Sequence, residues 1–178
     1  MSILVRASRD PDLPAITAIY THAVTHGTAS FELTPPDEPE MARRREALLA
    51  GGFPYLVAEQ GGRLAGYAYA GPYRTRPAYR STVEDSIYVA PDAHRHGVGR
   101  SLLAALIREA EAQDFRLMVA VIGDEASHGS IGLHASLGFE AAGVFRGVGH
   151  KGGRWLSTVL MQRALGPGIT TPPTRPLP

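Results

Sequence analysis

The sequence predicts a single mixed α/β domain whose sheet pairs its strands in both directions. The chain has 178 residues, of which 44% are hydrophobic and 20% charged, so it can bury one ordinary core. Strand-like and helix-like apolar patterns alternate along it. Two strand patterns meet at Gly61-Gly62, a hairpin signal, whereas a later strand–helix–strand run implies a parallel crossover.

Local signals set the expected elements. Asp10-Pro11 reads as a helix N-cap followed by proline at the first helical position, and Gly51-Gly52 ends a second helix. The order is β-α-α-β-β-β-α-β-α-β-β. Strands are expected at 3–6, 55–59, 64–70, 86–89, 117–122 and on both sides of Gly152-Gly153, and helices from Asp10, at 40–50, after Gly99 and at 128–137.

Two segments carry more specific expectations. The strand at 117–122 is apolar throughout, so we expect both of its faces to be buried. Residues 166–178 are rich in proline and poor in apolar side chains, so the domain should span 1–165 and be followed by a tail. This tail is expected to be solvated, or alternatively to pack on a neighbouring molecule.

Composition excludes several classes of protein. Net charge is +1, which argues against a nucleic-acid or membrane-surface binder. The absence of cysteine rules out disulfides, thiolate metal sites and a covalent cysteine mechanism, and fits a reducing cytosol. The N-terminus lacks a signal-peptide pattern, and no apolar run approaches the roughly 20 residues of a membrane span. We therefore expect a cytoplasmic protein.

A glycine-bearing loop, His94 to Gly99, opens the helix after the middle strand. Its glycines leave backbone N–H groups exposed at the positive end of the helix dipole, where a phosphate or pyrophosphate can bind. Arg95 and Arg100 add positive charge and Ser101 a hydroxyl. Such a glycine pair is also common as a plain turn. No Walker sequence is present, and no strand near the N-terminus leads directly into a dinucleotide-binding G-x-G-x-x-G pattern.

A motif later in the chain makes the interpretation of this loop more specific. Strand, x-x-x-G-x-G, helix, strand, and then L-H-x-x-L-G-F at 133–139 resemble the GCN5-related N-acetyltransferase (GNAT) superfamily over nearly all of 1–165. The stretches FPYLVAE, AGYAYAGPYRTRPAY, STVEDSIYV and VAVIG resemble phosphinothricin and methionine sulfoximine N-acetyltransferases. The resemblance implies the GNAT fold, acetyl-CoA as acetyl donor, a small amino-acid analogue as acceptor, and a homodimer.

The resemblance also implies where the cofactor binds. The backbone of Ile87, Tyr88 and Val89 would pair with the pantetheine arm. Two positions depart from the family pattern, because His94 stands where Gln or Arg is usual and Ser127 where Asn is usual. The remaining expected cofactor residues are Arg95, His96, Gly97, Val98, Gly99, Arg100 and Ser101.

Acetyl transfer to an amine requires removal of an ammonium proton and benefits from protonation of the departing thiolate. The resemblance implies that Glu84 is the base, with a plain surface carboxylate in a strand as the alternative. Its neighbour Asp85 should point to the opposite face of the strand. The family resemblance implies a proton-transfer role for His134, although a helix histidine can equally be satisfied by a neighbour. Tyr88 is a further candidate acid, or else a packing residue.

Arg74 and Arg76 are the expected anchors for the acceptor, because two guanidinium groups can bind a carboxylate and a phosphinate or sulfoximine oxygen. The alternative is an exposed basic loop. His94 and His96 lack a third ligand at a supporting spacing, so no metal is expected. The other expected substrate-binding residues are Phe31, Thr75, Tyr79, Glu84, Asp85 and Ser86.

Together with the resemblance, the sequence predicts an acetyl-CoA-dependent N-acetyltransferase that acetylates the α-amine of a small amino-acid analogue such as phosphinothricin or methionine sulfoximine. Two alternatives stay open: a different amine acceptor, such as an amino acid, a polyamine or a protein N-terminus, and a non-catalytic acyl-CoA-binding module. The physical hint of a dimer is an apolar late hairpin carrying Trp155, Leu156, Val159, Leu160 and Met161.

Overall fold

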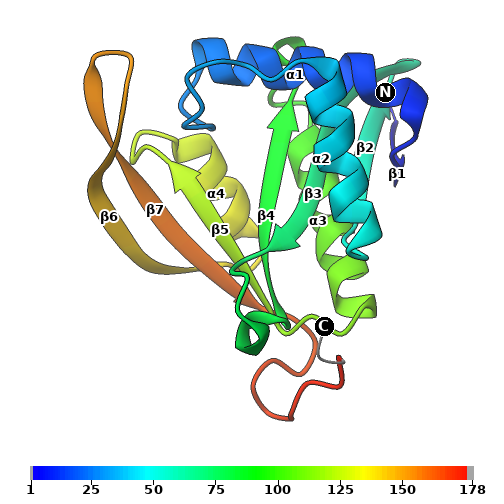
Figure 1. Ribbon diagram of the computed structural model, residues 1–178, viewed down its shortest axis with the longest axis vertical. Helices are drawn as coiled ribbons and strands as arrows, with labels where there is room; N and C mark the ends of the chain where they lie inside the picture. Colours follow the sequence, from blue (N-terminus) through cyan, green and yellow to red (C-terminus); the bar gives the residue numbers. More distant parts are fainter. Residues whose placement is uncertain (1, 176–178) are drawn as a thin grey trace.

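The computed structural model describes residues 2–175 and shows one curved seven-stranded sheet between two layers of helices (Figure 1). The strand order is β1-β2-β3-β4-β5-β7-β6. The strands are β1 (Ile3–Ala7), β2 (Tyr55–Gln60), β3 (Arg63–Pro72), β4 (Thr82–Val89), β5 (Leu117–Gly123), β6 (Glu140–Lys151) and β7 (Arg154–Ala164). The helices are α1 (Leu13–His26), α2 (Glu38–Ala50), α3 (Val98–Ala112) and α4 (His128–Ser136).

The predicted element order and mixed pairing are confirmed. The β4–β5 pair is parallel and every other neighbouring pair is antiparallel. The predicted and observed strand boundaries differ where a strand begins with polar residues. Strand β4 begins at Thr82, four residues before the predicted start. Its polar residues Glu84 and Asp85 lie in a central strand and interrupt the apolar pattern from which a strand is predicted.

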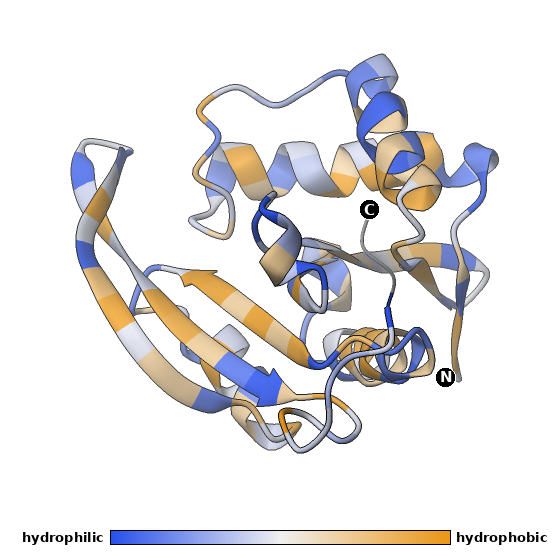
Figure 2. Cartoon of the chain, turned by 60° about the horizontal axis from the view of Figure 1, so that its bottom comes forward, coloured by the Kyte–Doolittle hydropathy of each residue, from blue (hydrophilic) through white to orange (hydrophobic). Residues whose placement is uncertain are grey.

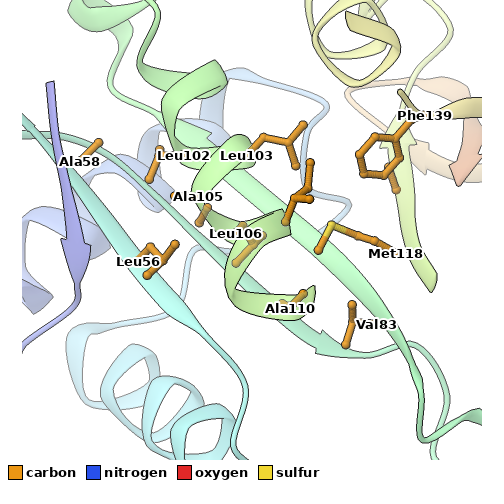
Figure 3. Close-up of a cluster of buried hydrophobic side chains, with 14 of the residues drawn as sticks. Leu56, Ala58, Val83, Leu102, Leu103, Ala105, Leu106, Ala110, Met118 and Phe139 are labelled. Carbon is orange, nitrogen blue, oxygen red and sulfur yellow. The ribbon is translucent and has the colours of Figure 1, made fainter. Parts of the chain in front are cut away.

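One core fills the space between α3 and the sheet (Figure 3). Helix α3 places an apolar residue on its buried face at nearly every turn, and Leu102, Leu103 and Leu106 are completely buried. They pack against strand residues such as Val83 and Met118. Truncating one of these leucines to alanine is expected to cost roughly 2–5 kcal/mol, so this layer fixes the strands that carry the site.

The second core lies on the opposite face, beneath α1 and α2, and is rich in tyrosine. The rings of Tyr55 and Tyr67 stack at 5.8 Å, and those of Tyr67 and Tyr88 at 5.2 Å. Tyr20 of α1 meets Tyr88 edge-on at 5.0 Å. Because the side chain of Tyr88 belongs to this core, the even-numbered residues of β4 face α1 and α2.

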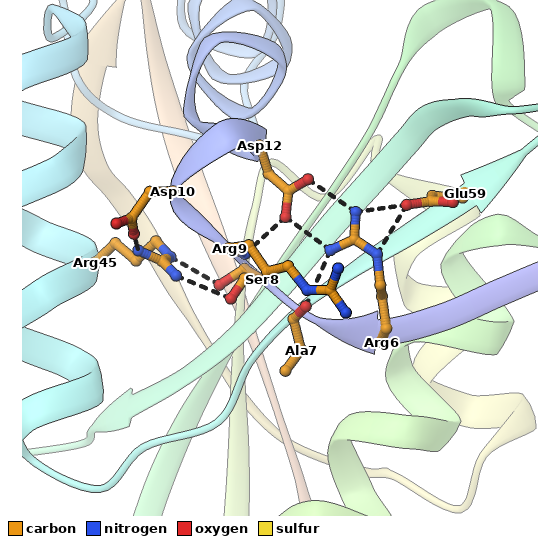
Figure 4. Close-up of polar contacts among 8 residues, drawn as sticks. All are labelled: Arg6, Ala7, Ser8, Arg9, Asp10, Asp12, Arg45 and Glu59. Carbon is orange, nitrogen blue, oxygen red and sulfur yellow. Dashed lines mark hydrogen bonds and ion pairs between the residues drawn. The ribbon is translucent and has the colours of Figure 1, made fainter.

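A polar network ties the N-terminal strand to both helices of this layer (Figure 4). Arg6 donates to both carboxylate oxygens of Asp12 at 2.8 Å and also binds Glu59 on β2. Arg45 of α2 is buried and donates to Ser8 and Asp10, each at 2.8 Å. These contacts satisfy buried charge and lie away from the cavity described below.

The prediction that β5 is buried on both faces is wrong. Met118, Ala120 and Ile122 point into the α3–α4 core, but Val121 on the other face is 38% exposed. The apolar run reflects a parallel strand whose second face is only partly covered. The uncovered part adjoins Glu84, which lies opposite Val119 in the register.

The described part of the proline-rich tail is mostly exposed, as expected, but several hydrogen bonds hold it to its own chain. Arg116 donates to the Gly168 and Pro172 carbonyls and to Thr171 Oγ1. Arg175 lies over the Phe115 ring at 3.8 Å. The last three residues of the predicted tail lie outside the described residues.

The β6–β7 hairpin curves away from the rest of the sheet, and Figure 2 shows apolar residues along much of it. Leu156 and Met161 are buried, whereas Trp155 is 71% and Phe145 56% exposed. No helix within 2–175 combines the length and apolarity that crossing a membrane requires.

Candidate active site

A cavity of about 920 Å³ lies where four elements meet: the C-terminal half of α1, the end of β4, the loop before α3, and α4. It is adjacent to a fork in the sheet. The β4–β5 ladder runs from Thr82 and Leu117 to Asp85 and Ala120, whereas β4 continues to Val89 and β5 to Gly123. Beyond the fork, the edge of β4 can pair with a ligand in place of a strand.

Backbone direction decides which groups of β4 face that opening. The Ala90 N–H donates to the Ala65 carbonyl on the β3 side at 2.8 Å. Alternation therefore directs the N–H groups of Ile87 and Val89 toward the fork. Tyr88 corrects our expectation, because its backbone faces Tyr67 on β3, so its role would rest on its side chain.

The predicted phosphate loop has the backbone shape that its sequence requires. Arg95 and Gly97 have φ of 65° and 86°, in the left-handed region, and α3 begins immediately afterwards. The His94 Nε2 lies 3.0 Å from the Val89 carbonyl oxygen and ties the loop to the end of β4. His94 thus replaces the usual Gln or Arg with a side chain that holds the loop itself.

Most of the expected cofactor residues line the cavity, and two do not. The lining includes Ile87, Tyr88, Val89, His94, Arg95, Gly97, Val98, Gly99, Arg100 and Ser127. His96 and Ser101 lie outside it, and the Ser101 N–H is already bonded to the Gly97 carbonyl within the helix. The Ser127 hydroxyl donates to the Gly123 carbonyl at 2.6 Å, so it shapes the turn into α4.

Three further histidines reach the cavity and were missed by sequence reasoning. His22 and His26 come from α1 and stack at 4.4 Å, and His128 begins α4. Among the described residues, the ionisable side chains that line the cavity are basic apart from the Tyr88 phenol. The spacing of His22 and His26 places them on one helix face, but no sequence signal showed that this face meets the loop.

The cavity fits a ligand with phosphate groups at one end and an extended chain at the other. Basic side chains and a helix N-terminus meet at the loop, and free backbone groups follow along β4. Gly99 packs closely on α4, since a methyl group there would lie 3.2 Å from the Leu133 side chain. These are the features that an acetyl-CoA site requires.

Glu84 lies on the α1–α2 face of β4, four residues before Tyr88. Partial burial, and then the nearby charge of Asp85, raise its pKa, while the charge of Arg74 opposes the shift. A carboxylate with a raised pKa is a better proton acceptor near neutral pH than an exposed one. As predicted, Asp85 faces the other side of the sheet, where it is buried.

The loop that carries Arg74 and Arg76 follows β3 and lies on the side of Glu84 away from the cavity. Arg74, Thr75 and Arg76 are exposed, which agrees both with an acceptor site open to solvent and with an exposed basic loop. The Arg74 guanidinium lies over the Tyr73 ring at 5.2 Å, and Tyr73 meets Tyr79 edge-on at 5.8 Å. Ser86 lies between Glu84 and Tyr88 on the same face.

Phe31 lies on the loop between α1 and α2, which closes over the end of β5. A methyl group at Gly149 would overlap the Phe31 ring, and one at Gly123 would overlap the Thr28 carbonyl. Lys151 Nζ donates to the Ser30 carbonyl at 2.7 Å. The α1–α2 loop is therefore held by the β6–β7 hairpin on the open face beside Glu84.

The two candidate acids have different surroundings. Burial among Tyr67, Tyr20 and Tyr69 raises the pKa of Tyr88, so its phenol keeps its proton. His134 is buried, and its ring nitrogens lie 3.0 Å from Asp85 Oδ2 and 2.7 Å from the Ser130 carbonyl oxygen. Its surroundings are those of a satisfied helix histidine, the alternative that the sequence left open.

Fold and site together define an α/β protein built to hold a phosphate-bearing, extended ligand beside an ionisable carboxylate. Comparison with known proteins identifies this class. The Acetyltransferase (GNAT) family matches residues 16–139. The chain belongs to this acetyltransferase family, which confirms the predicted superfamily and fold.

Individual relatives narrow the resemblance. A phosphinothricin N-acetyltransferase of Alcaligenes faecalis is 57% identical over 95% of this chain and 86% of its own. An L-methionine sulfoximine/L-methionine sulfone acetyltransferase of Pseudomonas aeruginosa is 42% identical over 97% of this chain and all of its own. The crystal structure of a phosphinothricin acetyltransferase from Sinorhizobium meliloti in complex with AcCoA superposes with a TM-score of 0.96, at 46% identity, covering 99% of this chain and 96% of that one.

Proposed function

We propose that this protein transfers the acetyl group of acetyl-CoA to the α-amine of a small anionic amino-acid analogue, such as phosphinothricin or methionine sulfoximine. The observation that carries the proposal is the fork between β4 and β5. It joins a basic phosphate loop to backbone donors and ends next to Glu84. The 57% and 42% identical relatives supply the acceptor class.

In this proposal the pyrophosphate binds the loop from His94 to Arg100 and the first turn of α3. The pantetheine arm runs along β4, where the N–H groups of Ile87 and Val89 donate to it. The acceptor binds on the open face, and Arg74 and Arg76 bind its two acidic groups.

Chemistry then follows by direct attack. Glu84 accepts the proton of the substrate ammonium, directly or through one water, and the free amine attacks the thioester carbonyl carbon. A carbon–nitrogen bond forms as the carbon–sulfur bond breaks, and a backbone N–H near Val89 stabilises the oxyanion. The Tyr88 phenol donates a proton to the departing thiolate, and the nitrogen of the new amide loses its second proton to the phenolate, which restores the phenol. No enzyme nucleophile takes part, which suits a chain without cysteine.

Two wider proposals accompany this function. The reaction takes place in the cytoplasm, where acetyl-CoA is available, and its biological effect is detoxification of the acceptor. The enzyme acts as a homodimer, supported by the exposed apolar side chains Phe145, Val148 and Trp155 on the β6–β7 hairpin.

An acceptor panel tests the function. Release of CoA thiol is measured with phosphinothricin, methionine sulfoximine, methionine sulfone, glutamate, a polyamine and an N-terminal peptide. We expect rapid turnover with the phosphorus and sulfur analogues, and a strong increase in KM for them in Arg74→Ala and Arg76→Ala. Turnover with the polyamine or the peptide instead would reassign the acceptor, and binding of acetyl-CoA without turnover on any amine would favour a non-catalytic module.

A further inference from the structure

The contact between Asp85 and His134 lies at the apex of the fork. Asp85 is the last residue of β4 that pairs with β5, and His134 reaches it from α4, the helix that follows β5. Both side chains are at least 96% buried. The contact therefore joins the point where the strands part to the helix that forms one wall of the cavity.

Hydrogen-bond chemistry fixes the proton count of this pair. The Ser130 carbonyl can only accept a hydrogen bond, and so can an ionised Asp85. An imidazole with one ring proton can satisfy only one of them, yet its nitrogens lie 2.7 and 3.0 Å from the two acceptor oxygens. The Ser130 hydroxyl, the other group near Nδ1, is much farther away at 3.5 Å. The geometry therefore requires one proton on Nδ1, donated to the Ser130 carbonyl, and one proton between Nε2 and Asp85 Oδ2, which the imidazole also carries when Asp85 is ionised.

Burial alone would lower the pKa of His134, but the hydrogen bond and the charge of Asp85 outweigh it and raise this pKa, which favours an imidazolium paired with a carboxylate. The Phe139 ring meets the imidazole edge-on at 4.9 Å, and Asp85 Oδ1 is buried with no hydrogen-bond partner. The titratable neighbour along the strand, Glu84, faces the other side of the sheet. A buried charge needs a partner of opposite sign, and each member of this pair supplies it for the other.

We propose that Asp85 and His134 form a buried ion pair that holds α4 against the fork and so sets the width of the groove between β4 and α4. Both are then positioning residues that take no part in proton transfer. This inference rests on the proposed function only in taking the groove as the acetyl-CoA site. The ion pair itself is independent of any acceptor. Moving α4 would displace Leu133 and Ser130, which line the cavity opposite β4.

The first test needs no variant. In ¹⁵N-histidine-labelled protein, long-range ¹H–¹⁵N spectra count the protons on each imidazole, and His134→Gln identifies the resonance. We expect His134 to carry two ring protons at pH 7. A His134 ring with one proton at pH 7 would overturn the proposal.

The second test separates positioning from proton transfer. Asp85→Asn keeps the shape but leaves His134 without its counter-charge, and we expect kcat/KM for acetyl-CoA to fall by about tenfold or more, with little change in KM for the acceptor. The double variant Asp85→Asn/His134→Gln restores a neutral hydrogen-bonded pair and should recover most of that loss. Glu46→Gln, an exposed carboxylate on α2, is the matched control.

Binding of CoA is measured by calorimetry without acceptor, so that the affinity depends on the groove alone. This affinity should fall in Asp85→Asn and recover in the double variant. A double variant that is as impaired as His134→Gln, or more so, would show that His134 takes part in the chemistry and would refute a positioning role. If the wild-type protein binds no CoA, the proposed function fails, whereas the ring-proton count still decides the ion pair.

Discussion

At the scale of single residues, alternation along β4 assigns different tasks to neighbours. Glu84 faces the open side of the sheet and Asp85 the buried side. The sequence predicted this division from strand periodicity alone. It could not predict the partner of Asp85, because His134 lies 49 residues away and only the folded chain brings them together.

Glu84 yields the sharpest prediction at this scale. Its pKa is raised above the ordinary value of 4.5, so the active carboxylate is present above the raised pKa and is lost as pH falls through it. The pH profile of kcat/KM should therefore show an acidic limb. Glu84→Gln should lower kcat by about 10²–10⁴-fold and remove this limb, while acetyl-CoA affinity stays within about twofold.

Glu125→Gln, which changes an exposed carboxylate beside Arg146, is the control and should retain the wild-type profile. An acidic limb that survives unchanged in Glu84→Gln would assign the base to another group.

The residues that sequence reasoning missed share one cause. His22, His26 and His128 become cavity residues only because α1 and α4 meet the loop before α3. His96 and Ser101 were included because they are neighbours of the glycines in sequence, but they lie outside the cavity. Motif spacing identifies the loop, and tertiary packing decides which side chains of the loop face a ligand.

At the scale of elements, the fork is the feature that turns a sheet into a binding site. Parallel pairing of β4 and β5 was predictable from the crossover through α3, but the point at which the pairing ends was not. The apolar sequence of β5 likewise did not show that α1 and α2 leave part of its second face open. Both properties depend on how the helices distribute over the sheet.

The C-terminal tail gives a prediction about an element. The Arg116 side chain is largely buried and joins Asp114 to the carbonyls of Gly168 and Pro172. Arg116→Ala removes these charged hydrogen bonds, so we expect the free energy of unfolding to fall by about 2–4 kcal/mol. Urea denaturation followed by circular dichroism measures the change.

The control is Arg146→Ala, whose exposed pair with Glu125 should contribute no more than about 0.5 kcal/mol. Equal stability of the two variants would mean that the tail contacts are not part of the folded structure in solution.

At the scale of the whole molecule, element order, mixed pairing and family were all available from the sequence. Periodicity and turn residues define the elements, and the loop at 94–99 with the motif at 133–139 defines the family. The packing of the tail was not available, because its proline-rich composition resembles that of solvated termini. Its order comes from partners such as Arg116 and Asp114 in a distant turn.

Assembly is tested at this scale. The exposed Phe145 and Trp155 on the β6–β7 hairpin should be covered in a homodimer, so light scattering should give twice the mass of one chain. Phe145→Glu/Trp155→Glu places charge on this surface and should yield a folded monomer. Leu4→Glu, which changes an exposed apolar residue on β1 at the opposite edge of the sheet, should remain dimeric. A monomeric wild-type protein would contradict the proposal.

The central claim is that acetyl leaves acetyl-CoA for the α-amine of a small anionic amino acid. The most direct measurement is carbon NMR of the products formed from ¹³C-acetyl-CoA and phosphinothricin. The account predicts one product, N-acetylated at the α-amine, formed in equal amount to free CoA thiol and only when the enzyme is present. Labelled acetate as the sole product, or acetyl-CoA that stays intact beside phosphinothricin, would contradict it.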